Sequence, residues 1–297
     1  MKYALLGAVA SVAVAACAAA PAMAQDVEIR HAVARVIVIV EDRADIGVEV
    51  TQGGSRLPQI QVRRDGRDVR IDGGLRRRGG FFNGDSDGIR NCRSGPAGAR
   101  QPGEGASVEV REVGRVRMED APLIVLRTPR DVDVNASGAV FGAIGRGARS
   151  IELGNGGCGD WNVANTDGDL SLSMGGSGSI RAGASRSLEA NVGGSGSVMA
   201  GATGAAEANV GGSGTITIAR ISGPSELAIG GSGDIVIRDG NVPSLDISIG
   251  GSGSVDYGGA TRDLDVSIAG SGDVRVRAAT GQVSRAVIGS GDIVIGR

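Results

Sequence analysis

The chain has 297 residues, and its 31 Lys and Arg against 33 Asp and Glu give a formal net charge of −2. This near balance gives no reason to expect a nucleic acid as a partner, because nucleic-acid binding uses a basic surface. Glycine supplies 53 residues and aromatic residues only 2%, a composition usually typical of low-complexity chains. Here, however, the glycines recur at a regular spacing, which indicates a repeat.

Residues 1–24 are typical of a secretory signal peptide and are not expected to belong to the fold. Lys2 supplies the positive charge, an apolar stretch follows, and the small residues Ala22 and Ala24 precede Gln25. This pattern predicts cleavage between Ala24 and Gln25. The apolar stretch is too short for a stable transmembrane anchor.

An alternative interpretation of the same segment is a lipoprotein signal. Val-Ala-Ala-Cys at 14–17 is similar to a lipobox, in which Cys17 would carry lipid. A membrane would then be a partner only through that lipid. In both cases we expect an exported protein that is periplasmic, associated with the outer membrane or on the cell surface.

Residues 25–135 are expected to form irregular β coils and a cap ahead of the regular repeat. Alternating apolar and polar residues predict short strands there, and a cap is needed because the open end of a solenoid is an unpaired strand edge. Residues 74–106 lack alternation and predict a long inserted loop. The predicted strands lie at 34–41, 46–53, 59–66, 68–74, 107–112, 114–120 and 122–129.

The inserted loop contains a weak candidate for a calcium site. Asn83, Asp85 and Asp87 are followed by Gly88, as in the first half of an EF-hand loop, but the twelfth position is Ser94 where a bidentate glutamate is needed. A polar loop tip explains these residues as well. We expect neither a metal nor a cofactor.

Two cysteines follow the signal peptide, Cys92 in the inserted loop and Cys158 in the repeat. Paired cysteines of an exported chain usually form a disulfide, and this one would stabilise the fold by about 4 kcal/mol in the chain-entropy model. Zinc is not expected, because His31 is the only histidine available to complete a ligand set.

Residues 136–297 repeat a Gly-Ser-Gly turn, as in GGSGDIVI at 230–237. The residue between the glycines recurs along the chain at nearly constant steps, and such a short, regular period is typical of a solenoid. The turn residues are Ser137, Cys158, Ser177, Ser195, Ser213, Ser232, Ser252, Ser271 and Ser290.

Each repeat carries two runs in which apolar and polar residues alternate, such as 235–237 and 245–249. Alternation predicts strands with one buried face, so Ile235, Ile247 and their equivalents should point inward and Asp246 outward. A single repeat cannot bury its own apolar face. We therefore predict an all-β, right-handed parallel β-solenoid with coils of about 19 residues.

The turns are interpreted as scaffolding. A corner with a positive φ suits glycine, and a Cβ would clash with the adjacent coil. The serines Ser177, Ser195, Ser213, Ser232, Ser252, Ser271 and Ser290 should then form a ladder of hydroxyls bonded along the rod.

Three chemical interpretations of the glycine-rich turns are disfavoured. Phosphate-binding loops precede a helix, but strands follow these turns, and Lys2 is the only lysine. A hydrolase elbow also leads into a helix and needs a histidine. RTX-type calcium repeats place their aspartate one residue later, and only some copies carry one, at Asp160, Asp234, Asp273 and Asp292.

The main enzymatic alternative is a polysaccharide lyase or hydrolase built on a β-helix. Asp246 and Asp265 are expected to stack on one outer face, with Glu189 and Glu207 on the equivalent face of earlier coils. Such sites use clustered carboxylates and aromatic platforms, but the aromatic residues of the repeats are expected to point inward. We therefore assign no catalytic residues.

The sequence stops at 293–297, immediately after a predicted strand, and no C-terminal cap is visible. An uncapped coil has an unpaired edge, so we expect weak end-to-end self-association.

The string of Gly-Ser-Gly turns, together with IGVEVTQG at 46–53, resembles the bacterial "putative auto-transporter adhesin, head GIN domain" family. The likeness extends from about residue 33 to 297, and the insertion at 74–106 and the two cysteines depart from it. The resemblance implies a non-enzymatic exported β-solenoid, adhesin-like, with an envelope glycan or protein as partner. It carries over no catalytic residues.

Overall fold

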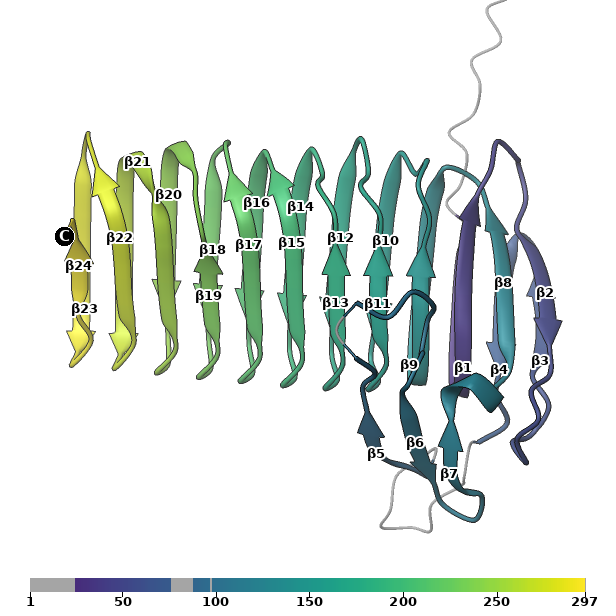
Figure 1. The fold of residues 1–297 in the computed structure, drawn as a ribbon. Helices are drawn as coiled ribbons and strands as arrows, with labels where there is room; N and C mark the ends of the chain where they lie inside the picture. Colours follow the sequence, from purple (N-terminus) through teal and green to yellow (C-terminus); the bar gives the residue numbers. More distant parts are fainter. Residues whose placement is uncertain (1–24, 76–87, 97, 297) are drawn as a thin grey trace, which may run out of the picture.

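The computed structural model describes residues 25–75, 88–96 and 98–296, and these form an all-β rod of stacked coils (Figure 1). The signal-peptide prediction, with Cys17 and Ala24, lies outside the described residues, which begin at Gln25. No helix in the described ranges is long and apolar enough to cross a bilayer.

One strand of each coil contributes to a first sheet that runs the length of the rod. Its strands are parallel except for the antiparallel pair β3–β4 at one end. In order along the rod they are β3 (Gln61–Asp65), β4 (Asp68–Asp72), the first half of β1 (Asp26–Val40), the first half of β9 (Asp131–Ile144), β10 (Ser150–Asn155), β12 (Asp169–Met174), β14 (Ser187–Val192), β16 (Ala205–Val210), β18 (Ser225–Ile229), β20 (Asn241–Ile249), the second half of β21 (Ser254–Gly270) and β23 (Val283–Gly289).

The other strand of each coil contributes to a second sheet. It is also parallel except at the same end of the rod, where β2 and β8 are antiparallel. Its order is β2 (Gly47–Thr51), β8 (Leu123–Thr128), the second half of β1, the second half of β9, β11 (Asp160–Val163), β13 (Ser179–Ala182), β15 (Ser197–Thr203), β17 (Thr215–Ile221), β19 (Asp234–Ile237), the first half of β21, β22 (Asp273–Ala279) and β24 (Ile293–Ile295).

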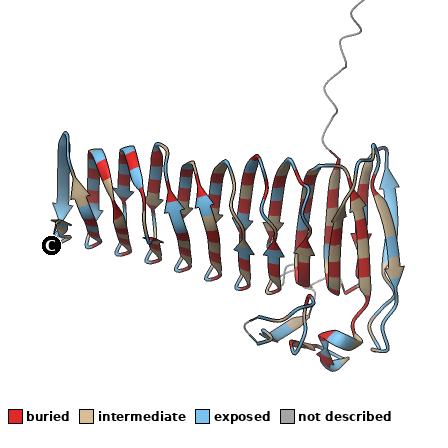
Figure 2. Cartoon of the chain, turned by 45° about the horizontal axis from the view of Figure 1, so that its top comes forward, coloured by how far each residue is buried: buried red, intermediate tan, exposed pale blue. Residues whose placement is uncertain are grey.

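The strand register confirms the predicted repeat. Leu170 pairs with Leu188, and Leu245 pairs with Leu264, so the steps between turns are also the offsets between paired strands of successive coils. The predicted inward residues are buried, with Ile235 at 0% and Ile247 at 2% exposure. Buried and exposed residues alternate along the strands in Figure 2. The fold is therefore the predicted stacked β-solenoid.

The turns differ from the prediction in two respects. None of the glycines in the 230–233 turn has a positive φ. Gly270 and Gly289, in two later Gly-Ser turns, do have one. The predicted clash with the adjacent coil is confirmed, because a Cβ on Gly176 would lie 1.8 Å from the Gly157 oxygen. The expected hydroxyl ladder is also wrong, since the described turn serines share one hydroxyl–hydroxyl bond, from Ser290 to Ser271.

Backbone hydrogen bonds join successive turns instead. The N–H of Ser195 donates to the Gly176 carbonyl at 3.1 Å, and the N–H of Ser232 donates to the Gly212 carbonyl at 3.0 Å. The same bond recurs at every serine turn from 177 to 290. The serine side chains of these turns are exposed, so the repeat is built on main-chain contact.

The long loop predicted at 74–106 is wrong in part. β5 (Ile89–Arg93) lies within it and forms an antiparallel sheet with β6 (Ser107–Val110) and β7 (Gly114–Arg117), followed by the 3-10 turn η1 (Met118–Asp120). This lobe packs beside the rod through Val108 and Met118, which contact Val33 and Phe141 in a second apolar cluster. The sequence of β5 does not alternate between apolar and polar residues, so this strand was not predicted.

A disulfide ties the lobe to the rod, as predicted. Cys92 of β5 is bonded to Cys158 of the first complete repeat turn, with their Cα atoms 6.1 Å apart. Both cysteines are partly buried against the lobe's apolar cluster.

Candidate functional site

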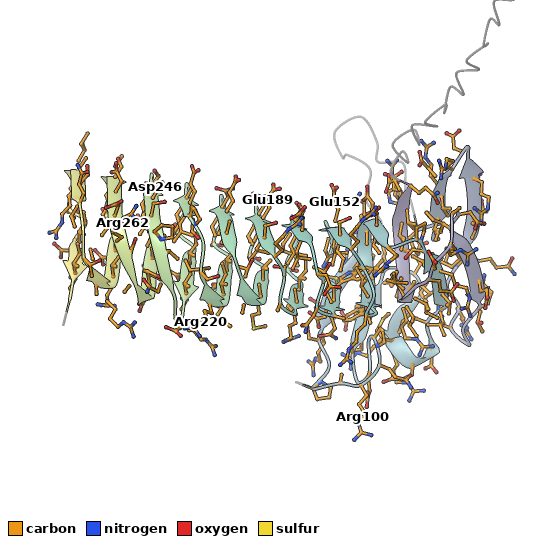
Figure 3. All side chains as sticks on the ribbon, turned by 90° about the horizontal axis from the view of Figure 1, so that it is seen from above. Arg100, Glu152, Glu189, Arg220, Asp246 and Arg262 are labelled. Carbon is orange, nitrogen blue, oxygen red and sulfur yellow. A yellow bond between two sulfur atoms is a disulfide. The ribbon has the colours of Figure 1, made fainter. Side chains whose placement is uncertain are left out.

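The outer face of the first sheet carries a column of carboxylates, one residue per coil, which we call the carboxylate ladder. Its members alternate with buried residues along each strand and point to solvent. In coil order, the register places Asp26, Asp133, Glu152, Ser171, Glu189, Glu207, Glu226, Asp246 and Asp265 side by side. Figure 3 shows Glu152, Glu189 and Asp246 on one side of the rod, away from Arg100 and Arg220.

The ladder concentrates negative charge. Neighbouring strands lie about 4.8 Å apart, and eight of the nine positions are Asp or Glu, with Ser171 as the exception. None of the eight forms an ion pair with a residue in the described part of the chain. Like charges placed directly opposite each other on adjacent strands are destabilising, so this arrangement is not explained by stability.

Asparagine side chains donate hydrogen bonds to several of these carboxylates. Each asparagine lies two residues further along the same strand, at the next position that faces outward. Asn191 donates to Glu189 at 2.9 Å and Asn209 donates to Glu207 at 3.2 Å. Asn135 donates to Asp133 at 3.1 Å. These bonds orient the carboxylates without neutralising them.

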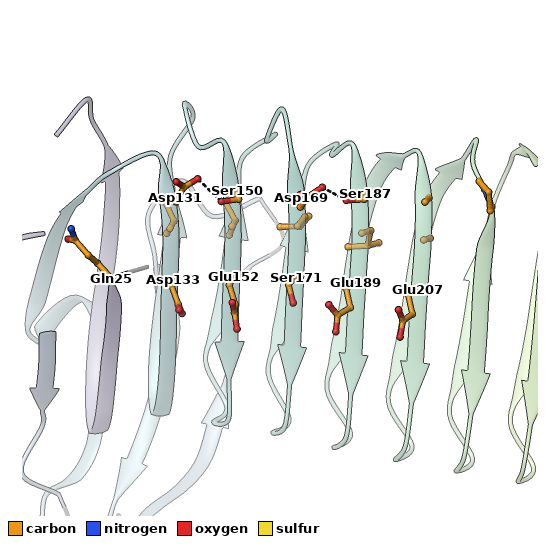
Figure 4. A pocket seen from close by; sticks show the side chains of 17 residues that line it. Gln25, Asp131, Asp133, Ser150, Glu152, Asp169, Ser171, Ser187, Glu189 and Glu207 are labelled. Atoms are coloured by element: carbon orange, nitrogen blue, oxygen red, sulfur yellow. Dashed lines mark hydrogen bonds between the residues drawn. The ribbon is translucent and has the colours of Figure 1, made fainter. Parts of the chain in front are cut away.

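A groove of about 530 Å³ runs along the ladder at the ends where the first-sheet strands begin. Gln25 and Pro224 lie at its two ends. Figure 4 shows one wall, in which Asp133, Glu152, Ser171, Glu189 and Glu207 stand in a row. The floor is the backbone between the two rows of outward side chains, and the groove thus spans five coils.

The opposite wall of the groove is neutralised. Asp131 accepts hydrogen bonds from Arg149 and from the Ser150 hydroxyl, the latter at 2.7 Å. Asp169 accepts bonds from Arg186 at 2.9 Å and from the Ser187 hydroxyl. The uncompensated charge of the groove therefore lies on the ladder wall, at Asp133, Glu152, Glu189 and Glu207.

Proton binding is perturbed at one end of the groove. Burial, together with Asp26, Glu152 and Asp68, raises the pKa of Asp133 to about 7. Burial also raises the pKa of Asp26, although the hydrogen bond from Asn135 opposes this shift. The carboxylates at this end therefore hold protons at a pH at which exposed ones do not.

This shift predicts how stability depends on pH. The folded state binds the Asp133 proton more tightly than the unfolded chain does, so the contribution of this group to stability falls as the pH rises from about 4 to about 7. Asp133→Asn should therefore raise the free energy of unfolding at pH 8 by about 1–2 kcal/mol and leave it nearly unchanged at pH 4. Urea denaturation at the two pH values measures the difference, and equal effects at both would contradict the assignment.

The sequence-predicted residues divide between this face and other places. Asp246 and Asp265 stack on the ladder as expected, and Glu189 and Glu207 lie on the same face, in the groove. Asp26, Asp133, Glu152 and Glu226 were not anticipated. Asn83, Asp85 and Asp87 lie outside the described residues.

Three of the four aspartates that suggested an RTX-type repeat, Asp160, Asp234 and Asp273, accept a hydrogen bond from the next coil. Asp160 accepts a bond from the Ser179 N–H at 3.0 Å, and Asp234 accepts one from the Ser254 N–H at 3.2 Å. They thus brace one coil against the next. The described ranges contain no group of three or more His, Cys, Asp or Glu placed to hold a metal ion.

Comparisons with known proteins agree with the fold. Residues 225–296 match the model of the family described as "Putative auto-transporter adhesin, head GIN domain", which confirms the resemblance over that segment. No curated protein matches the chain. A solved structure, described as a "putative lipid binding protein from Parabacteroides distasonis ATCC 8503", superposes with a TM-score of 0.50 at 18% identity over 92% of this chain and 93% of that chain. At this identity the likeness shows the fold alone.

Proposed function

We propose that this chain is an exported, non-enzymatic module of the cell envelope or surface that binds an extended polycation along the groove. The observation that carries the proposal is the wall formed by Asp133, Glu152, Glu189 and Glu207, none of which has a cationic partner among the described residues. A ligand with several amines would supply the missing charges.

The spacing favours a flexible oligoamine over an extended peptide. Ladder positions recur about every 4.8 Å, whereas same-face side chains of a β-strand recur about every 6.6 Å. A chain of amines joined by short methylene linkers adjusts to the ladder spacing, and its methylenes can lie along the floor between the two walls. Ser171 divides the wall into two carboxylate pairs, Asp133–Glu152 and Glu189–Glu207.

Export is supported by the disulfide and by the adhesin description of the matching family. Disulfides persist in oxidising compartments. The lipid-binding name of the structural neighbour is not carried to this chain, because an anionic lipid surface would be repelled by the same carboxylates. An amine-bearing envelope glycan or protein fits them.

A non-enzymatic role is supported by the surroundings of the ladder. Trp161 and Tyr257 are fully buried, so neither is available as a sugar platform beside the carboxylates. The ladder itself repeats one kind of side chain over successive coils, which suits binding along its length.

The test is calorimetric titration of the purified chain with spermine at pH 8 and about 20 mM salt. The variant Glu152→Gln/Glu189→Gln/Glu207→Gln removes three groove charges, and it should weaken binding about 10- to 100-fold because each exposed ion pair contributes about 0.5–1 kcal/mol. A matched control, Glu226→Gln/Asp246→Asn/Asp265→Asn, removes three ladder charges beyond the groove and should weaken binding less than about 3-fold. All six residues are exposed, so folding should be preserved.

Two results would contradict the proposal. Equal losses in both triple variants would show that spermine responds to net charge and not to the groove. Production of reducing ends or unsaturated uronates from acidic polysaccharides, abolished by Asp246→Asn or Asp265→Asn, would show the chain to be a carbohydrate-active enzyme.

A further inference from the structure

A hollow of about 750 Å³ lies where the rod meets the lobe, between β5 and the corner turns that follow the ends of β10 and β12. It is therefore at the opposite edge of the first sheet from the groove, and we call it the disulfide hollow. The bonded pair Cys92 and Cys158 forms part of its wall, and both cysteines are only partly buried. A space of this volume admits small molecules of ordinary ligand size. The disulfide is thus open to reagents from solution.

The charge of the disulfide hollow is opposite to that of the groove. Among the described residues that line it there is no Asp or Glu, and Arg90 is the only Arg. Glu109 lies opposite Arg90 on the neighbouring strand β6, but it accepts bonds from Asn91 at 2.7 Å and from Arg115 at 3.3 Å. Arg90 itself forms no ion pair with a described residue. An anion that enters this space would therefore meet a guanidinium.

Strained backbone also occurs at this hollow. Three non-glycine residues of the described chain have a positive φ, and two of them, His31 at 50° and Asn91 at 42°, line the hollow. His31 lies in a bulge of β1, at the corner where β1 passes from the first sheet to the second. The corresponding corner of β9 has Gly138, with a φ of 99°. Glycine adopts such a conformation without strain, so a histidine there indicates a role for its side chain.

We propose that the Cys92–Cys158 disulfide is a site of thiol–disulfide exchange with small anionic thiols that enter the disulfide hollow. Arg90 attracts the negatively charged reagent. It also stabilises the cysteine thiolate that leaves, because a neighbouring cation favours a thiolate over a thiol. His31 supplies an imidazole in the same space, which can pass a proton to the released sulfur.

The proposed reaction consists of two balanced exchanges. The thiolate of the first reagent molecule attacks one sulfur of the disulfide, the S–S bond breaks, and its electron pair leaves on the other cysteine. The thiolate of a second molecule then attacks the reagent sulfur of the mixed disulfide and releases the second cysteine. The protein gains two electrons and two protons, and the two reagent thiols become one small-molecule disulfide.

Exchange should release β5 from the rod without unfolding either part. β5 remains paired with β6, and the lobe keeps the contacts of Val108 and Met118 with Val33 and Phe141. After reduction, amide hydrogen exchange should therefore become faster at residues 89–93 and stay unchanged in β16 and β18.

The reaction of the purified oxidised chain with two small thiols of opposite charge tests the proposal. Mercaptoethanesulfonate is anionic and cysteamine is cationic, and the rate of each is divided by its rate with a neutral model disulfide. Mass spectrometry after alkylation measures the mixed disulfide and the released cysteines. At low salt the normalised rate should be about 5-fold or more higher for mercaptoethanesulfonate, and this preference should fall at about 0.5 M salt.

Three variants locate the effect. Arg90→Gln should lower the preference for the anionic thiol about 3- to 5-fold. Arg93→Gln is the matched control, because Arg93 is exposed on the same strand but does not line the hollow, and it should change the preference less than about 1.5-fold. His31→Asn should slow the reaction with both thiols at least about 3-fold without lowering the urea midpoint, since asparagine tolerates the left-handed conformation.

Equal normalised rates for the two thiols in the unmodified chain would overturn the proposal, because exchange would then not depend on the charge of the hollow. A preference that persists in Arg90→Gln, or that Arg93→Gln loses to the same extent, would overturn it as well. An unchanged rate in His31→Asn would contradict the role given to the imidazole. Circular dichroism establishes that each variant is folded, and the salt dependence of the unmodified chain tests the proposal independently of all three.

Discussion

Gly231→Ala should lower the free energy of unfolding by about 2–4 kcal/mol, whereas Gly230→Ala, one residue earlier in the same turn, should change it by less than about 1 kcal/mol. A Cβ on Gly231 would lie 2.1 Å from the Gly212 oxygen of the preceding coil. Neither atom can retreat, because the N–H of Ser232 donates to that same oxygen at 3.0 Å. A Cβ on Gly230 meets nothing within 4 Å.

Urea denaturation followed by circular dichroism compares the two variants on one scale. Hydrogen exchange shows where in the rod the stability is lost. Because each coil contacts only its neighbours, the loss of protection should concentrate in the coils that meet at Gly212 and Gly231. Gly211→Ala and Gly212→Ala provide a second pair, with no contact and a 2.2 Å contact respectively. Equal losses within each pair would show that these glycines serve backbone conformation and not the close approach of coils.

The solenoid was predictable because two independent periods agree in the sequence. Alternation at 245–249 and 264–268 assigns a buried face to each strand, and the repeat step between these runs aligns the strands of successive coils. A shift of one residue would expose every apolar side chain, so the pattern allows one register only. The same reasoning placed Trp161 and Tyr257 inside.

The prediction was weakest where contacts join segments without a common period. β1 lies between β8 and β9 in the second sheet although it precedes both in the chain, and no repeat spacing records that order. The strand β5 is held by its pairing with β6 and by the disulfide of Cys92. Its own sequence shows no alternation of apolar and polar residues. Positive φ was predicted for the turn glycines and is absent from the 230–233 turn, whereas the predicted clash of a Cβ with the adjacent coil is confirmed.

The candidate site was half visible in the sequence. Glu189, Glu207, Asp246 and Asp265 were placed on one face because the step is nearly constant among them. Counting back from Glu189 by one repeat at a time reaches Ser171, then Glu152, then Asp133, so the rest of that wall could have been found in the same way. Asp26 could not, because β1 lies outside the repeat order. The neutral character of the opposite wall could not be predicted either. It depends on the ion pairs of Arg149 and Arg186, which the repeat spacing does not reveal.

Trp161→Val should be the most damaging single change in the core, with a loss of about 3–4 kcal/mol. Trp161 is completely buried in β11, in a column where the following coils carry Ile180, Val198 and Ile216 and the preceding coil carries Gly142. The indole therefore fills the space of two positions. Its N–H is buried without a partner among the described residues, so volume and not hydrogen bonding keeps it there.

Gly142 and Trp161 should behave as a coupled pair. A Cβ on Gly142 would lie 2.3 Å from the indole ring, so Gly142→Ala alone is expected to cost about 1–3 kcal/mol. In Gly142→Ala/Trp161→Val the methyl enters the space that the ring has left, and the double variant should be more stable than the sum of the single losses predicts by about 1 kcal/mol or more. Urea denaturation followed by circular dichroism measures all four proteins, since the probe does not depend on the only tryptophan. Strict additivity would mean that the coils relax independently around these two positions, and the close contact between them would then have no bearing on stability.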